Sequence, residues 1–142
     1  MQIDSILQSK GMTVYTVSAH APISEAVQVL NEHRIGSVVV LADNGSVAGI
    51  LSERDIVRQL TDDPASLLGR AVREVMTTSV ITCTRMATVS ELMEQMTEHR
   101  IRHIPIVEDG ELIGIVSIGD VVKRKIEEAE QEALALREYI AS

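Results

Sequence analysis

Residues 14–58 read VYTVSAHAPISEAVQVLNEHRIGSVVVLADNGSVAGILSERDIVR, and residues 80–123 repeat the pattern as VITCTRMATVSELMEQMTEHRIRHIPIVEDGELIGIVSIGDVVK. The two stretches share a Ser-Glu pair, a His-Arg-Ile string and a late aspartate. They stay in register apart from a one-residue deletion in the second stretch, which lacks a counterpart of Asn44. A duplicated unit is expected to pack as a pseudo-symmetric pair, and a groove between two such units offers two related sites. The duplication therefore predicts two equivalent halves with two related clefts.

Each copy alternates between β-branched runs and amphipathic stretches. Apolar residues of 23–30 and 89–96 recur at helical spacing, and a further helix is expected after Ser52 and after Ser117. Asp-Asn-Gly and Asp-Gly turns separate pairs of β-branched runs, which is a hairpin signal. Strands are therefore predicted at residues 15–17, 37–41, 47–51, 80–82, 103–107 and 112–116. The unit is β-α-β-β-α, an α/β fold in the broad sense (α+β).

Short apolar segments precede the two copies. Residues 3–8 and 72–77 each read as a lead-in to the half that follows, and residues 61–69 read as the linker. The predicted domains are 1–66 and 67–142, the second with an extended C-terminal helix. A unit of this size has difficulty building a sufficient core by itself, so the two halves are expected to share one core.

The composition excludes several classes of protein. The chain has 142 residues, 45% of them apolar, with no Phe or Trp and a formal net charge of −8. An acidic chain of this kind argues against nucleic acid and against anionic membrane as partners. No apolar run has the length of a transmembrane helix, no secretory h-region is present, and a single cysteine forms no internal disulfide. A soluble cytoplasmic protein is expected.

One motif occurs at the same place in both copies. Gly49-Ile-Leu-Ser52-Glu-Arg-Asp55 and Gly114-Ile-Val-Ser117-Ile-Gly-Asp120 follow a predicted strand and open a predicted helix. A helix N-terminus favours an anion, and a carboxylate one turn later can accept hydrogen bonds from a vicinal diol, so the motif fits a ribose-phosphate site. The alternative is a plain helix cap, which explains the serine and the aspartate. The cap leaves the glycine and the recurrence of the whole string unexplained.

The duplication, the element order, the string Arg-His-Ile-Pro-Ile at 102–106 and both glycine-serine-aspartate motifs together resemble a tandem pair of CBS domains. The resemblance covers essentially the whole chain and implies two clefts that bind adenine nucleotides. The implied ligand is AMP, ADP, ATP, NAD(H) or S-adenosylmethionine, with no catalytic cofactor. It also implies a homodimer, because lone pairs in this family commonly form discs from two modules.

The resemblance assigns roles residue by residue. Asp55 and Asp120 would hold ribose hydroxyls, and Ser52 and Ser117 would lie at the ribose or phosphate. Phosphate contacts are implied for Arg54, Arg102 and His103. The adenine pocket would be lined by Thr16, Thr82, Val38, Ile104 and Pro105.

The two copies differ within this pattern. Gly36-Ser37 stands where the second copy has Arg102-His103, and Gly119 stands where the first copy has Arg54. Ser37 is also a candidate residue of the nucleotide-binding site. The clefts should therefore differ in positive charge and bind ligand unequally.

Three hypotheses about function follow. The preferred one is a regulatory sensor that reports its adenine ligand to an unidentified partner by conformational change. The second is a ligand-independent interaction module with vestigial clefts. The third, an enzyme, lacks a nucleophile with a base, and the four histidines lack metal-ligand spacing, so no catalytic or metal residue is assigned.

The C-terminal stretch carries Val122, Ile126, Ala129, Ala133, Leu136 and Ile140 in steps of four and three, a coiled-coil-like stripe. Either it makes a dimer contact or the helix lies back on its own domain.

Cys83 is expected to be a small buried residue, since no base for a nucleophilic thiol is evident.

Overall fold

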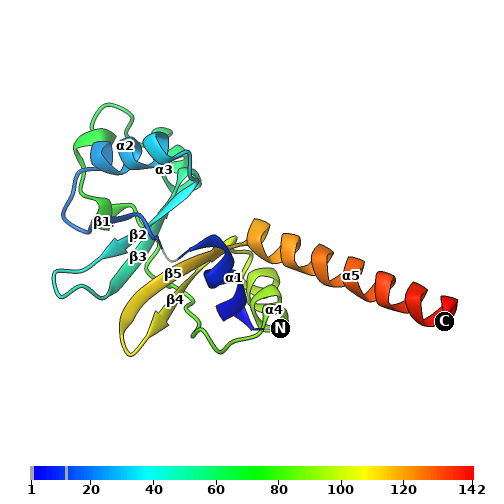
Figure 1. Cartoon of the computed structure of the whole chain (residues 1–142). Helices are drawn as coiled ribbons and strands as arrows, with labels where there is room; N and C mark the ends of the chain where they lie inside the picture. Colours follow the sequence, from blue (N-terminus) through cyan, green and yellow to red (C-terminus); the bar gives the residue numbers. More distant parts are fainter. Residues whose placement is uncertain (1, 12) are drawn as a thin grey trace.

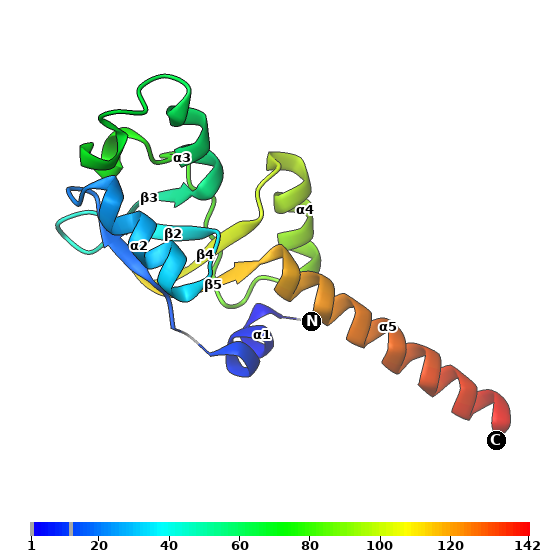
Figure 2. The ribbon, with the colours of Figure 1, turned by 90° about the horizontal axis from the view of Figure 1, so that it is seen from above.

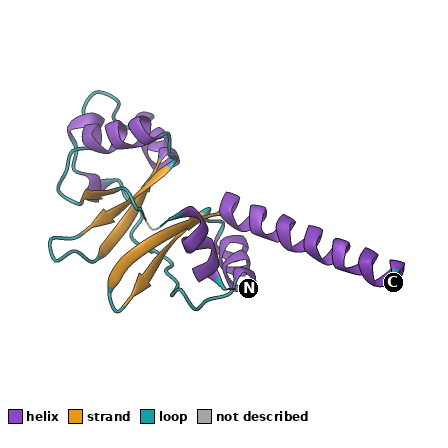
Figure 3. Ribbon diagram, viewed as in Figure 1, coloured by secondary structure: helices purple, strands orange, loops and turns teal. Residues whose placement is uncertain are grey.

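The computed structural model describes residues 2–11 and 13–142 and divides them into two lobes, with one long helix that leaves the second lobe (Figure 1). The first half contains β1 (Thr16–Ser18), α2 (Ile23–His33), β2 (Ser37–Leu41), β3 (Val47–Ser52) and α3 (Glu53–Leu60). The second contains α4 (Val89–His99), β4 (His103–Glu108), β5 (Glu111–Ser117) and α5 (Ile118–Ala141). α1 (Ile3–Lys10) precedes the first half, and two 3-10 turns, Leu67–Gly69 and Val72–Glu74, precede the second. Both lobes combine helices with strands, as the duplication predicts (Figure 3).

The sheets of the two lobes differ in size. In the first lobe β1 pairs parallel to β2 and β2 pairs antiparallel to β3, whereas β4 and β5 form a two-stranded sheet. The strand predicted at 80–82 is wrong: that segment meets β4 through a single parallel bridge between Cys83 and Ile106. The first lobe pairs Thr16 with Val39, and the equivalent of Val39 is Pro105. Proline has no amide hydrogen to donate, so it shortens the ladder here.

The predicted helix starts are confirmed with their caps. Thr88 accepts a hydrogen bond from the Glu91 amide, and the Glu91 carboxylate accepts from the Thr88 amide, which forms a capping box at the start of α4. α2 begins after Pro22, which supplies no side-chain cap. Both helices end at an arginine in the left-handed conformation, Arg34 and Arg100, so the two copies also turn out of their helices in the same way.

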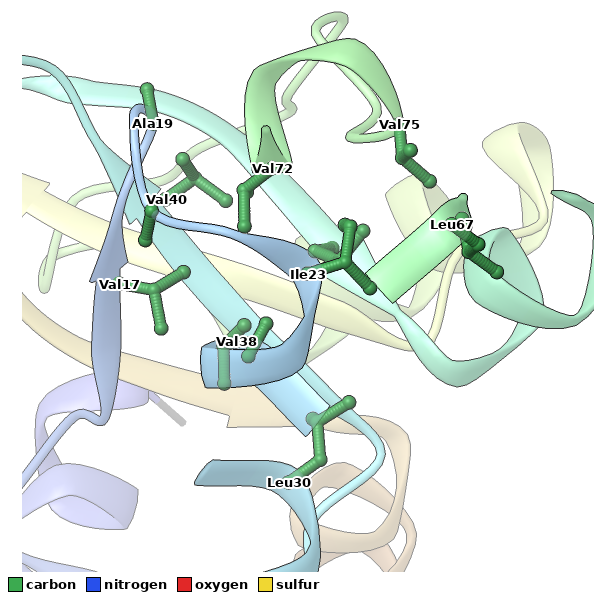
Figure 4. Packing of buried hydrophobic residues seen from close by; sticks show 12 residues of the cluster. Val17, Ala19, Ile23, Leu30, Val38, Val40, Leu67, Val72 and Val75 are labelled. Carbon is green, nitrogen blue, oxygen red and sulfur yellow. The ribbon is translucent and has the colours of Figure 1, made fainter. Parts of the chain in front are cut away.

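The expectation of one shared core is wrong. The buried apolar residues that the structure describes form two separate clusters, one in each lobe. The first is centred on α2, β2 and β3, and Figure 4 shows Val17, Val38 and Val40 packed with Ile23 and Leu30. The second joins α4 to β4 and β5. Both consist of aliphatic side chains, as the absence of Phe and Trp requires.

The lead-in segments also pack differently from the prediction, because each belongs to the opposite lobe. Ile3, Ile6 and Leu7 of α1 lie in the second cluster, and Gly114 of β5 directly faces Leu7. Leu67, Val72 and Val75 lie in the first cluster, where Figure 4 shows them beside Ile23. Each core is therefore completed by a segment that precedes the other copy. This exchange makes the halves interdependent even though their cores are separate.

The last helix, α5, is 24 residues long against 8 for its counterpart α3. Val121 near its start is buried, but every residue from 129 to 142 is exposed. Figure 2 shows the helix running away from both lobes. The alternative that α5 lies back on its own domain is therefore wrong for residues 129–142. In the described ranges 2–11 and 13–142, no helix is both long enough and apolar enough to span a membrane.

Candidate functional site

A cleft of about 400 Å³ lies where the two halves and their connection meet. The first half contributes the start of β2 and the junction from β3 to α3, and the second half contributes the turn after α4. The connection contributes Thr77, Ser79 and Val80. The lining comprises Gly36, Ser37, Ile50, Ser52, Glu53, Arg54, Asp55, Arg58, Thr77, Ser79, Val80, Arg100, Ile101, Arg102 and His103. Any molecule in this cleft would touch both copies at once.

Asp55 stands at one wall of the cleft, fixed by the N-terminus of α3. Its Oδ2 accepts the Ser52 amide at 2.9 Å and the Ser52 hydroxyl at 3.0 Å, while its own amide donates to Ser52 Oγ at 3.2 Å. This is a capping box, so the helix-cap interpretation of the motif is confirmed. The cap uses one carboxylate oxygen. Oδ1 has a long contact with the Thr77 hydroxyl at 3.4 Å, which leaves it able to accept hydrogen bonds from a ligand.

Ser37 lines the cleft at the start of β2, beside the first turn of α3. The residue is 6% exposed, and its hydroxyl has no hydrogen-bond partner among the described residues. A buried polar group without a partner is rare because it loses its bonds to water without replacement. The hydroxyl is therefore a free donor and acceptor at the cleft wall. Its counterpart in the second copy is His103, so this position differs between the halves.

The electrostatics of the cleft are opposite to those of the whole chain. Arg54, Arg58, Arg100 and Arg102 line it against the two carboxylates of Glu53 and Asp55. The chain as a whole carries a formal charge of −8. Guanidinium groups bind phosphate and carboxylate oxygens in paired geometry, so this cleft is suited to an anionic ligand.

His103 adds a hydrogen-bonding group without a charge. Burial, and after it the positive charge of Lys10, lowers the pKa of His103, against the opposing effect of Asp120 and with a further contribution from Arg102. The imidazole ring is therefore mostly neutral near pH 7. In that form it can donate one hydrogen bond and accept another.

The equivalent carboxylate of the second copy, Asp120, has an additional partner. Asp120 Oδ2 accepts the Ser117 amide at 2.9 Å in the same capping box, and the Lys10 ammonium group lies 2.6 Å from that oxygen. Lys10 also donates to the Ile115 carbonyl at 2.8 Å. Burial by itself would raise the pKa of Asp120, but the hydrogen bonds from Lys10 and Ser117 and the charge of Lys10 together lower it. Gly49 faces Met76 as Gly114 faces Leu7, so Met76 is the counterpart of Leu7, and Ser79, which lines the cleft, is the counterpart of Lys10.

The remaining predicted site residues lie elsewhere. Val38 and Ile104 are 1% and 0% exposed and belong to the two cores. Pro105 is buried in β4, Thr16 is half-buried in β1, and Thr82 is exposed. The cleft thus brings together six of the predicted residues, namely Ser37, Ser52, Arg54, Asp55, Arg102 and His103. Ser117 and Asp120 are together at the start of α5.

Sequence reasoning missed several lining residues. Arg58 follows Arg54 by one helical turn, and that spacing could have placed both arginines on one face of α3. Arg100 takes the left-handed conformation at the end of α4, which no pattern in one sequence reveals. Thr77 is held by a bridge to Ile50, with hydrogen bonds of 2.8 and 3.0 Å between the two backbones. Such long-range pairing has no local signature.

Two further residues with reactive or titratable side chains play no part in the cleft. Cys83 is half-buried, and burial followed by the charge of Glu91 raises the pKa of its thiol, which disfavours the reactive thiolate. His33 ends α2 and stacks on Tyr15 with ring centroids 3.6 Å apart. Among residues 2–11 and 13–142 there is no group of three or more His, Cys, Asp or Glu side chains that could hold a metal ion.

Two α+β repeats that exchange their lead-in segments and meet at a basic cleft define the class of protein. The family model described as "CBS domain" matches residues 10–62 and 72–127, so the chain belongs to the CBS-domain family. The CBS domain-containing protein CBSX3, mitochondrial, from Arabidopsis thaliana is 34% identical over 97% of this chain and 71% of its own length. The protein YhcV from Bacillus subtilis is 31% identical, with 84% of each chain covered.

Solved structures show the same architecture. The CBS-domain protein ATU1752 from Agrobacterium tumefaciens superimposes with a TM-score of 0.83 at 43% identity, covering 87% of this chain and 92% of that one. The CBS domain pair of protein MJ0100, solved in complex with 5′-methylthioadenosine and S-adenosyl-L-methionine, gives a TM-score of 0.76 at 25% identity, covering 87% of this chain and 98% of that one. The predicted fold and family are confirmed. CBS pairs are regulatory modules, and at least one of similar fold binds adenosine compounds.

Proposed function

We propose that this protein is a sensor that binds an adenine nucleotide between its two CBS domains and signals the bound state to a partner through a change in their arrangement. The observation that supports this most strongly is the composition of the cleft. A capped carboxylate, four arginines and an unpaired buried hydroxyl converge there from both copies and from their connection. These are the groups that a ribose and its phosphates require.

The ribose would bind at Asp55. Because the cap holds Oδ2, the carboxylate is fixed in position and directs Oδ1 to a ligand. Two vicinal hydroxyls that donate to a carboxylate form charge-assisted hydrogen bonds, each worth about 1.5–3 kcal/mol. Ser37, with no partner of its own, would complete its hydrogen bonding on the same ligand.

The phosphates would bind among the arginines. Arg54 and Arg58 lie on α3, and Arg100 and Arg102 come from the other copy. Four guanidinium groups exceed what one phosphate needs, which favours a ligand with several phosphates, such as ATP, ADP or NAD(H), over AMP. The adenine would pack on aliphatic walls such as Ile50, Val80 and Ile101, since the chain has no Phe or Trp.

Signalling would follow from where the ligand binds. The two cores are separate, so the lobes can change their relative arrangement without breaking either core. A ligand that binds both copies favours the arrangement in which its contacts from both are made, and a partner that recognises this arrangement is thereby regulated. The regulated partner is a protein, because the charge of −8 disfavours nucleic acid and anionic membrane. A cytoplasmic location belongs to the same proposal.

The two clefts would bind unequally. The cleft at Asp55 has Arg54 beside the carboxylate, whereas Asp120 has Gly119 at that position and already pairs with Lys10. A ligand at Asp120 competes with this ion pair, so we expect the cleft at Asp55 to bind first. The alternative is a ligand-independent interaction module, favoured by the exposed apolar stripe of α5.

A thermal-shift panel with AMP, ADP, ATP, NAD, NADH, S-adenosylmethionine and GTP tests the proposal on protein freed of co-purified nucleotide. A ligand at 100 times its dissociation constant stabilises the fold by about 2.7 kcal/mol. We expect a raised Tm with at least one adenine ligand, and a loss of that shift in Arg102→Ala. The matched control is Arg73→Ala, which removes an exposed arginine outside the cleft. No shift with any ligand would support the interaction module instead.

A further inference from the structure

The terminal helix α5 presents an apolar stripe that nothing in the described chain covers. Val122, Ile126, Leu136 and Ile140 are 46%, 53%, 59% and 74% exposed. With Ala129 and Ala133 they recur in alternating steps of four and three, which places them on one face of the helix as the a and d positions of a heptad. An apolar face of this length is stable in water only when another surface covers it.

We propose that a second copy of this chain covers the stripe, and that the two α5 helices run parallel as a two-stranded coiled coil. This contact and its orientation would specify the expected homodimer, and they do not depend on nucleotide binding. Ile126, Ala133 and Ile140 would be the a positions, and Val122, Ala129 and Leu136 the d positions. At 24 residues the helix is about 36 Å long, enough for three heptads along the stripe.

The charges beside the stripe indicate the orientation. The e positions are Lys123, Glu130 and Arg137, and the g positions are Lys125, Glu132 and Tyr139. In a parallel pair, each g residue lies next to the following e residue of the other helix. Lys125 then meets the partner's Glu130, and Glu132 meets the partner's Arg137. Both pairs are of opposite charge, and two-fold symmetry repeats each of them.

An antiparallel pair that overlaps the same stripe would be repelled. In that arrangement e positions face e positions and g positions face g positions, with Val122 opposite the partner's Ile140. Glu130 would meet the partner's Glu130, Glu132 the partner's Glu132, and Lys123 the partner's Arg137. Like charges at such short range are unfavourable, so the sequence selects the parallel arrangement.

Three of these four charges have no counter-charge at helical spacing on their own helix, whereas Lys125 lies 3.7 Å from the Glu128 carboxylate. Neither Glu130 nor Glu132 has a basic residue three or four positions away, and Arg137 has no acidic residue at that spacing. Among the described residues none of the three takes part in an ion pair, whereas nearer the lobe Arg124 pairs with Glu127. Charges of both signs that an isolated helix leaves unpaired fit a second helix that carries the same series.

The lobe leaves this face free for a partner. Val121 is buried, Lys125 donates to the Ser90 hydroxyl of α4 at 3.2 Å, and Arg124 is partly covered, so α5 rests on its own lobe through these residues. The stripe begins at Val122, on a neighbouring face. One helix can therefore contact its own α4 and a partner's α5 together.

Charge reversal on the full-length chain tests the orientation by sedimentation or light scattering across a dilution series. Glu132→Lys alone and Arg137→Glu alone each turn two attractions into two repulsions, and we expect the dimer dissociation constant to rise about ten-fold. The double variant, which exchanges the two charges, should return to within about three-fold of the unmodified chain. Because both side chains are exposed, the folded lobes are unaffected. A double variant as weak as the single variants, or a monomer at every concentration, overturns the proposal.

A cysteine pair gives an independent readout in a Cys83→Ala background. Ala133→Cys places two thiols opposite each other at an a position of a parallel pair, within disulfide range, and should cross-link fully under mild oxidation. Gln131→Cys lies on the outer face of the coiled coil and is the matched control, which should not cross-link. Equal cross-linking at the two positions, or none at Ala133→Cys, contradicts the parallel coiled coil. Nucleotide thermal shifts of the charge variants should be unchanged, which separates this result from the fate of the proposed sensor.

Discussion

The two copies of the repeat build the same helix cap and then use it differently. In both, the aspartate Oδ2 accepts the serine amide at 2.9 Å at the start of a helix. Around Asp55 the rest of the site is an open cleft with four arginines, whereas Asp120 is 2.6 Å from the ammonium group of Lys10. The divergent residues are Lys10 for Ser79, Gly119 for Arg54 and His103 for Ser37. Duplication thus preserved the local scaffold, and a few substitutions gave the two aspartates different surroundings.

The exchange of lead-in segments should give the largest effect. Leu7→Ala empties part of the second core and Leu67→Ala part of the first, and each side chain is 1% exposed. We expect each change to lower the free energy of unfolding by about 2–5 kcal/mol. The matched control is Leu68→Ala, because Leu68 is 55% exposed and should change stability by no more than about 0.5 kcal/mol.

Hydrogen exchange would show which lobe each change loosens. Leu7→Ala should speed exchange in β4 and β5, although Leu7 precedes the first copy, and Leu67→Ala should speed exchange in β1, β2 and α2. If each variant instead loosened the lobe of the copy that follows it, the exchanged packing would be wrong.

Ligand binding should show the next largest effect and compares the two carboxylates directly. Asp55→Asn keeps a side chain that can cap α3 but removes the charge that would hold the ribose, at a cost of about 1.5–3 kcal/mol, or roughly 10- to 100-fold in Kd. Asp120→Asn is the matched control and should change the tighter Kd less than about three-fold. Calorimetric titration with the ligand from the thermal-shift panel measures both. Equal losses in the two variants would mean that the clefts are equivalent.

The ion pair at the second carboxylate predicts a pH dependence. The pKa of Asp120 is lowered in the folded protein, so this group stabilises the fold above the pKa of an unfolded aspartate and loses that contribution as the pH falls through the folded pKa. Lys10→Met, which removes the ammonium group but keeps an unbranched side chain, should raise the pKa of Asp120 and lower stability at pH 7 by roughly 0.5–1 kcal/mol.

The difference in stability between Lys10→Met and the unmodified chain should shrink as the pH falls below 3.8, the ordinary pKa of an aspartate. Urea unfolding across pH and NMR titration of the carboxyl measure the two quantities. Lys123→Met removes an exposed lysine and serves as control. A pKa of Asp120 that stays the same in Lys10→Met would show that the pair contributes nothing in solution.

The smallest effect concerns how the two equivalent helices begin. Thr88 caps α4 with its side chain, and Pro22 at the same place before α2 does not. Thr88→Ala should therefore cost about 1 kcal/mol, measured by urea unfolding. Thr84→Ala, at an exposed threonine four residues earlier, should be close to neutral. A neutral Thr88→Ala would mean that packing alone fixes the start of α4.

Much of the fold could be predicted because its signals are local. The helix periods, the capping boxes at Ser52, Thr88 and Ser117, and the Gly turns act within a few residues, and the structure has them where the sequence places them. The prediction of a strand at 80–82 was wrong because pairing at that place depends on Pro105, a residue of another strand. The candidate site was predicted in part for the same reason: Ser52 and Asp55 belong to a local motif, whereas Arg100 and Thr77 reach the cleft through long-range packing.

The sequence by itself determined the duplication, the order of elements, the caps and the charges near each capping aspartate, since all of these follow from spacing along the chain. Tertiary structure decided which lead-in completes which core, why Val38 and Ile104 are buried in the cores, and how Lys10 reaches Asp120 across 110 residues of sequence. Periodicity shows which side of an element is apolar, but it does not show which surface will cover that side. That depends on contacts between distant segments, and these form only when the whole chain has folded.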